Sequence, residues 1–154
     1  MEPPSIEKIV VYKNEPSEGE RVNILVIDGQ GGGMGKQLVA AIKANVPDAL
    51  VCAVRTNSAA TTAMLKAGAD RTATGENALI VGCRRADIIV GPIGMVIADS
   101  LYGEISPKMA LAVGQSDAKK IMIPVNSCDN IVAGVPDLSM NGLIQSAIEI
   151  IRSA

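Results

Sequence analysis

A cluster of glycines at residues 28–37, with the sequence D-G-Q-G-G-G-M-G-K-Q, is the part of the chain best suited to chemistry. It follows an apolar run at 22–27 and precedes apolar residues spaced for a helix. Glycines in such a turn let backbone N–H groups approach an anion without a Cβ in the way, and the helix N-terminus adds free donors. The alternative is a turn needed only for tight packing, which normally takes fewer glycines. We therefore predict a phosphate-binding loop, with contacts from Gly29, Gln30, Gly31, Gly32, Gly33, Met34 and Gly35.

The spacing of these glycines favours a dinucleotide over a nucleoside triphosphate. The arrangement G-x-x-x-G-x-G is met by Gly29, Gly33 and Gly35, and it resembles the nucleotide loop of short-chain dehydrogenases. The fingerprint G-x-G-x-x-G fails when it is begun at Gly29, because Met34 occupies its last place. The triphosphate-binding P-loop would need a hydroxyl at Gln37 to hold magnesium.

The end of the second expected strand suggests which dinucleotide would bind. An acidic residue about 20 residues beyond the glycine loop is typical of an NAD site, whereas an arginine accommodates the 2′-phosphate of NADP. Arg55 stands at that distance and is followed by Thr56 and Asn57. These three residues are candidate contacts, and the cofactor they predict is NADP(H). The alternative is a solvated arginine beside a helix cap at Ser58.

A second turn on the same expected edge of the sheet comprises Gly91, Pro92, Ile93 and Gly94. In open α/β sheets, ligands bind outside the carboxyl ends of the strands. These residues are therefore candidate contacts for a ribose or nicotinamide. Alternatively, they only shape a tight turn.

Catalytic groups are not identified by the sequence. It contains no histidine, which removes the commonest general base and any Cys–His nucleophile. Asp28, at the end of the first strand, supports an alternative function: a small magnesium-dependent hydrolase or transferase acting on a phosphorylated metabolite. Other polar residues expected near this edge are more often caps or loop residues: Glu76, Asn77, Asp99 and Glu104. We assign no metal site.

Alternating strands and helices position these residues. Strands are expected at 22–27, 49–54, 70–72, 88–90 and 121–125, and a sixth would lie at 131–135. Helices are expected over 38–46, 58–67, 76–85 and 106–113, and a last one carries Leu143, Ile144, Ala147, Ile148 and Ile151 on one face. Short loops between such elements indicate parallel strands joined by helical crossovers. The prediction is a single three-layer α/β Rossmann-like domain over residues 22–154 with a mainly parallel sheet of five or six strands, preceded by an N-terminal extension, 1–21.

Composition limits the partners. The net charge is −2, which argues against nucleic acid as a partner. The longest uncharged apolar stretch, residues 88–98, is too short to span a membrane, and the acidic, proline-rich start is not a signal peptide. A cytoplasmic location is expected. Because 48% of the residues are hydrophobic and 19% charged, we also expect a homo-oligomer. A non-catalytic oligomeric assembly protein, with a purely structural glycine loop, is therefore a further alternative.

Several segments together resemble a family of small bacterial Rossmann-like proteins of unknown function. They are the glycine loop, T-N-S-A-A-T at 56–61, M-L-K-A-G-A-D at 64–70, A-T-G-E-N-A at 73–78, A-D-I-I-V-G-P-I-G at 86–94 and I-P-V-N at 123–126. The resemblance implies the fold over about residues 22–150 and brings no activity with it.

Overall fold

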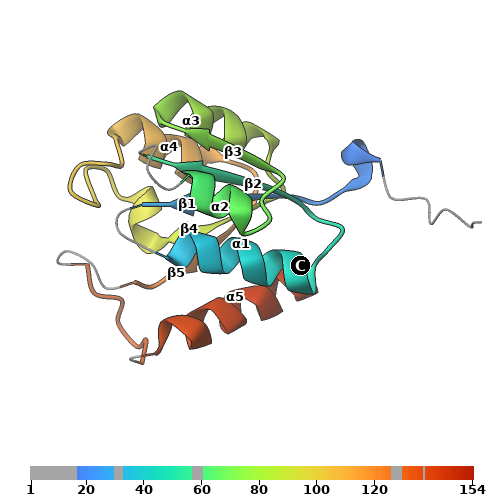
Figure 1. Ribbon diagram of the computed structural model, residues 1–154. Helices are drawn as coiled ribbons and strands as arrows, with labels where there is room; N and C mark the ends of the chain where they lie inside the picture. The colour runs from blue at the N-terminus through green and yellow to red at the C-terminus, as the bar shows by residue number, and fades with distance from the viewer. Residues whose placement is uncertain (1–16, 30–32, 57–60, 126–129, 137) are drawn as a thin grey trace, which may run out of the picture.

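The computed structural model describes residues 17–29, 33–56, 61–125, 130–136 and 138–154. Its core is a five-stranded sheet with the strand order β3-β2-β1-β4-β5, and every neighbouring pair is parallel (Figure 1). The predicted α/β Rossmann-like fold is confirmed, with five strands.

The strands are β1 (Asn23–Asp28), β2 (Leu50–Arg55), β3 (Arg71–Thr74), β4 (Ile88–Pro92) and β5 (Lys119–Ile123). The α-helices are α1 (Met34–Asn45), α2 (Thr61–Lys66), α3 (Glu76–Arg85), α4 (Pro107–Gln115) and α5 (Met140–Ser153). The described residues also include two 3-10 turns, η1 (Glu18–Glu20) and η3 (Ile93–Val96).

Strand β1 lies at the centre of the sheet and is buried on both faces. Its side chains alternate between two hydrophobic cores, as the pleat of a strand requires. Ile24 and Val26 join the core beneath α1, α2 and α5. Leu25 and Ile27 join the core beneath α3 and α4. The helices therefore form one layer on each side of the sheet, with α5 packed beside α1 (Figure 1).

Local sequence signals explain where several helices begin and end. Helix α3 has the predicted bounds, with Glu76 in its first turn and Arg84 and Arg85 in its last, as the helix dipole favours. Helix α4 begins as expected, because the Ser106 hydroxyl accepts a hydrogen bond from the Met109 N–H at 3.2 Å.

Other boundaries differ from the prediction. Strand β5 begins at Lys119, two residues before the expected Ile121, because an edge strand accommodates lysines: Lys119 is exposed and Lys120 Nζ donates a hydrogen bond of 2.6 Å to the Ser116 carbonyl. Residues 131–135 form no strand, and Ile131 is 82% exposed, so the sixth strand predicted there was wrong. The helix cap expected at Ser58 lies outside the described residues, whereas Gly68 has the left-handed φ of +111° expected after α2.

Among the described residues, no helix is long and apolar enough to cross a membrane.

Candidate functional site

The candidate residues gather at the carboxyl edge of the sheet, where the chain order reverses between β1 and β4. The segment after β1 leads to α1 on one face, and the segment after β4 leads through η3 to α4 on the other. Such a reversal leaves a crevice between the two connections, which is where open α/β sheets bind ligands. Figure 1 shows the start of α1 and the η3–α4 connection at the same end of the sheet.

Asp28 and Arg55 form a buried ion pair beneath this crevice. They are the last residues of β1 and β2 and lie opposite each other in the strand register. The Nε of Arg55 lies 3.6 Å from Oδ2 of Asp28, and the two residues are only 7% and 3% exposed. Nη2 of Arg55 donates a hydrogen bond of 3.0 Å to the carbonyl of Gly29. Arg55 therefore ties the end of β2 to the first residue of the glycine loop.

The first turn of α1 packs directly on Asp28. A Cβ on Gly35 would lie 2.5 Å from Oδ2 of Asp28, a separation that real Cβ atoms do not reach. The absence of a side chain at Gly35 lets the Asp28 carboxylate accept the backbone N–H groups of Gly29 and Gly35. The glycine at this position is thus explained by the close approach of the carboxylate.

The charge of Asp28 is balanced by its surroundings. Burial raises the pKa of its carboxyl above the usual 3.8, although Arg55 and the two backbone N–H groups act to lower it. Glu104, on the η3–α4 connection, contributes to the increase by like-charge repulsion. In its ionised form, the carboxylate faces a guanidinium, so the pair carries no net charge.

Helix α1 presents free donors above this pair. Its N-cap residue, Gly33, has no side chain to cap the helix, and the first intrahelical bond runs from the Gln37 N–H to the Gly33 carbonyl. The N–H groups of Met34, Gly35 and Lys36 therefore have no intrahelical acceptor, and that of Gly35 is taken by Asp28. The remaining donors and the positive end of the helix dipole are suited to an anion.

A loop formed by residues 97–106, between η3 and α4, contacts the carboxyl ends of β1 and β2. The Leu101 side chain occupies the space where a Cβ on Gly29 would stand. Glu104 accepts a hydrogen bond of 2.8 Å from the Thr56 hydroxyl, just beyond β2. The sequence analysis placed Asp99 and Glu104 of this loop near the edge, but it did not predict their contacts, which join residues about 50 or more positions apart.

A hydrogen bond between Ser106 and Glu76 connects the C-terminal end of this loop to α3. The Ser106 hydroxyl donates a hydrogen bond of 2.6 Å to Oε2 of Glu76, at the start of α3. Two of the acidic residues expected near this edge, Glu76 and Glu104, therefore hold the loop.

The candidate segment 91–94 is not a separate turn, because β4 continues to Pro92 and η3 begins at Ile93, and its glycines have a packing role. A Cβ on Gly91 would lie 2.7 Å from the backbone carbonyl of Ile27, so only glycine fits there. Pro92 and Gly94 are buried, and Ile93 begins η3. The Gly94 carbonyl accepts a hydrogen bond from the Ser100 hydroxyl, which helps to shape the 97–106 loop.

The structure brings most of the described candidates together. Gly29, Gly33, Met34, Gly35, Arg55 and Thr56 lie around the junction of β1, α1 and β2. Gln30, Gly31, Gly32 and Asn57 fall outside the described residues. Among the described residues, no group of three or more acidic or cysteine side chains is arranged to hold a metal ion.

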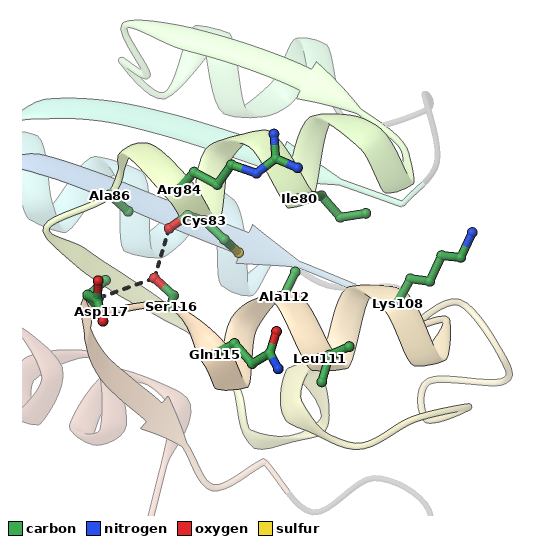
Figure 2. Close-up of a pocket in the computed structure, with 11 residues that line it drawn as sticks. Ile80, Cys83, Arg84, Ala86, Lys108, Leu111, Ala112, Gln115, Ser116 and Asp117 are labelled. Carbon is green, nitrogen blue, oxygen red and sulfur yellow. Dashed lines mark hydrogen bonds between the residues drawn. The ribbon is translucent and has the colours of Figure 1, made fainter.

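Two hollows lie elsewhere on the molecule. The larger, of about 470 Å³, runs between α3 and α4 (Figure 2). Its lining comes from the two helices and their ends: Ile80, Cys83, Arg84, Ala86, Lys108, Leu111, Ala112, Gln115, Ser116, Asp117 and Ala118. A smaller hollow, of about 340 Å³, lies against β2, β3 and α3. Neither of these two hollows is lined by described residues of the glycine loop.

The chain belongs to the family described as a domain of unknown function, DUF3842, whose model matches residues 23–154. No curated protein matches the chain. Among solved structures, it is similar to AnUbiX (PadA1), solved in complex with FMN and dimethylallyl pyrophosphate, with 14% identity, a TM-score of 0.51, and coverage of 86% of this chain and 91% of that one. It is also similar to a universal stress protein solved in complex with cAMP, with 20% identity, a TM-score of 0.42, and coverage of 66% and 94%.

Proposed function

We propose that this DUF3842-family chain is a nucleotide-binding module that holds the phosphates of its ligand at the junction of β1 and α1. The observation that carries the proposal is the start of α1, where the N–H groups of Met34 and Lys36 have no intrahelical acceptor, at the edge where the strand order reverses.

The buried pair supports an anion at this position. An unpaired aspartate at the end of β1 would repel a phosphate. Arg55 instead neutralises Asp28 from below, while Nη2 of the same guanidinium anchors the Gly29 carbonyl. Gly29 is thereby held in place before a ligand arrives, which lowers the entropy cost of binding at this residue.

Asp28 itself is better suited to support than to catalysis. It is 3% exposed and is engaged by Arg55 and by the N–H groups of Gly29 and Gly35. A magnesium-dependent hydrolase would need this carboxylate at an accessible position, so we favour binding over the hydrolase or transferase alternative.

Within the nucleotide class, NADP(H) is the finer proposal. It rests on Arg55, which stands at the end of β2 where NADP sites place an arginine. Arg55 is 7% exposed and its Nη2 donates to the Gly29 carbonyl, so a 2′-phosphate would reach the guanidinium only if Arg55 leaves this contact. Arg55→Lys keeps the charge but removes the planar fork. If Arg55 reads the 2′-phosphate, this variant loses the preference for NADP(H) over NAD(H) and keeps its NAD(H) affinity. An equal loss for both dinucleotides assigns Arg55 to the support of the loop alone.

The test of the proposed function is a binding panel with a variant at Gly33. Thermal unfolding is followed with NADPH, NADH, FMN, ADP and inorganic pyrophosphate, because a ligand at 100 times its Kd adds about 2.7 kcal/mol of stability. For a chain of this size, that corresponds to an increase in Tm of roughly 5–10 °C.

Gly33→Asp is expected to weaken ligand binding without unfolding the protein. Among the described residues, a Cβ on Gly33 would meet only Nε2 of Gln37, at 3.4 Å, and its φ of −60° suits any L-residue. The variant should therefore fold, because a negative charge near the positive end of the helix dipole is favourable. The same charge would repel phosphate, weakening binding by about tenfold or more.

Gly33→Asn is the matched control, since it adds the same bulk without charge. We expect it to retain more affinity than Gly33→Asp. Unchanged pyrophosphate affinity in Gly33→Asp would refute the assignment of the phosphate to this loop.

A further inference from the structure

The 97–106 loop carries an aromatic side chain that the fold does not use. Tyr102 is 81% exposed and is the sole aromatic residue in the part of the chain that the structure describes. Both hydrophobic cores are built from aliphatic, methionine and cysteine side chains. An aromatic ring displayed to solvent contributes little to stability and is characteristic of a surface that meets a partner or ligand.

The backbone beneath Tyr102 is strained. Asp99, Leu101 and Tyr102 have φ values of +63°, +54° and +54°, and Gly103 follows at +79°. Left-handed φ is unfavourable for L-residues and especially for bulky ones. Strain of this kind persists where the surrounding structure enforces it, and it is concentrated at ligand clamps and active sites.

Contacts on both sides of Tyr102 enforce this conformation beside the glycine loop. Leu101 is 8% exposed, and its side chain fills the space above Gly29. On the other side, Glu104 bonds to Thr56 at the end of β2. Tyr102 therefore lies at the surface between Leu101, which contacts Gly29, and Glu104, which bonds to Thr56.

We propose that Tyr102 is the stacking platform for the base of the bound nucleotide. This inference rests on the proposed function, since it takes the phosphates to lie at the start of α1. A ribose separates the phosphate of a nucleotide from its base, so the base must come to rest outside the glycine loop. The 97–106 loop borders that position through Leu101 and Gly29. Aromatic rings bind every base through its π face, which provides affinity with little base selectivity.

The test compares ADP with inorganic pyrophosphate by isothermal titration calorimetry. Tyr102→Asn removes the ring, while asparagine tolerates a left-handed φ, so the loop should keep its shape and the variant its thermal stability. We expect ADP to bind about tenfold more weakly to this variant and pyrophosphate to bind unchanged. Tyr102→Phe retains an aromatic face and should keep the ADP affinity.

A spectroscopic readout follows from the composition. The sequence has two tyrosines and no tryptophan or phenylalanine, so Tyr12→Phe leaves Tyr102 as the one tyrosine fluorophore. ADP should quench its emission after correction for light absorbed by the nucleotide, and pyrophosphate should not.

The possible failures are distinguishable. Equal ADP affinity in the parent protein and in Tyr102→Asn would overturn the stacking role and leave the phosphate site standing. If neither ADP nor pyrophosphate binds the parent protein, both the proposed function and the role of Tyr102 are overturned. If a protein partner rather than a nucleotide covers Tyr102, ADP will not quench its fluorescence, which also overturns the inference.

Discussion

Replacing Gly35 with alanine tests the close contact on which the site is built. The new Cβ would lie 2.5 Å from Oδ2 and 2.6 Å from Cγ of Asp28. Because Asp28 is wedged against Arg55 at the end of β1, either the carboxylate must leave its backbone donors or the first turn of α1 must shift.

The expected cost combines overpacking and lost hydrogen bonding. Forcing a methyl group into a packed site costs about 1–3 kcal/mol. Displacing a carboxylate from a backbone donor costs about 1.5–3 kcal/mol. Alanine is favoured over glycine in a helix by about 1 kcal/mol, which offsets part of this. We therefore expect Gly35→Ala to lower the free energy of unfolding by about 2–4 kcal/mol.

The matched control is Gly114→Ala in α4. No heavy atom lies within 4 Å of a Cβ at Gly114, so this substitution gains helix propensity without a clash. It should stabilise the protein by about 0.5–1 kcal/mol. Urea denaturation of the two variants and the parent protein measures both effects. If Gly35→Ala is as stable as Gly114→Ala, the carboxylate of Asp28 does not lie against Gly35 and the reasoning fails.

Two further predictions concern titratable groups away from the site. Burial acts to raise the pKa of Asp70, but the Val51 N–H and the Lys43 ammonium hold that pKa below 3.8. The ionised Asp70 carboxylate therefore stabilises the fold above pH 3.8, and this stabilisation is lost as the pH falls through the folded-state pKa. Asp70→Asn should therefore lower stability by about 1 kcal/mol at neutral pH, and urea titrations should show this difference shrinking in acid. Burial raises the pKa of the Cys83 thiol from 9.0 to about 11. The thiol of the unfolded chain therefore ionises first, and the free energy of unfolding should fall as the pH rises between these two values. Cys83→Ala should reduce that alkaline loss, and an identical pH profile for the two proteins would contradict the burial of the thiol.

Periodicity and turn residues were sufficient to predict the fold. The helix at 76–85 and the start of the helix after Ser106 each depend on neighbours within a few positions, so local sequence determines them. An apolar run was a less reliable predictor of a strand at the edge of the sheet. Residues 131–135 resemble a strand in composition but form none, since a run of apolar residues does not reveal whether a neighbouring strand is available.

The site was predicted only in part because its contacts are long-range. Asp28 and Arg55 were each noticed as candidates, but their pairing depends on the register of β1 against β2. Spacing alone cannot supply that register. The position of Leu101 over Gly29 depends in addition on four residues with left-handed φ in one loop, for which no sequence pattern was available.

The location of the phosphate is tested most directly by amide chemical shifts on adding inorganic pyrophosphate to ¹⁵N-labelled protein. At 15.9 kDa the chain suits such a measurement, and glycine amides occupy a distinct region of the spectrum. We predict the largest shift changes at Gly33, Met34 and Lys36, whose N–H groups at the start of α1 have no intrahelical acceptor, with a smaller change at Thr56. Changes confined to the groove between α3 and α4, around Leu111, would place the anion elsewhere and contradict the account.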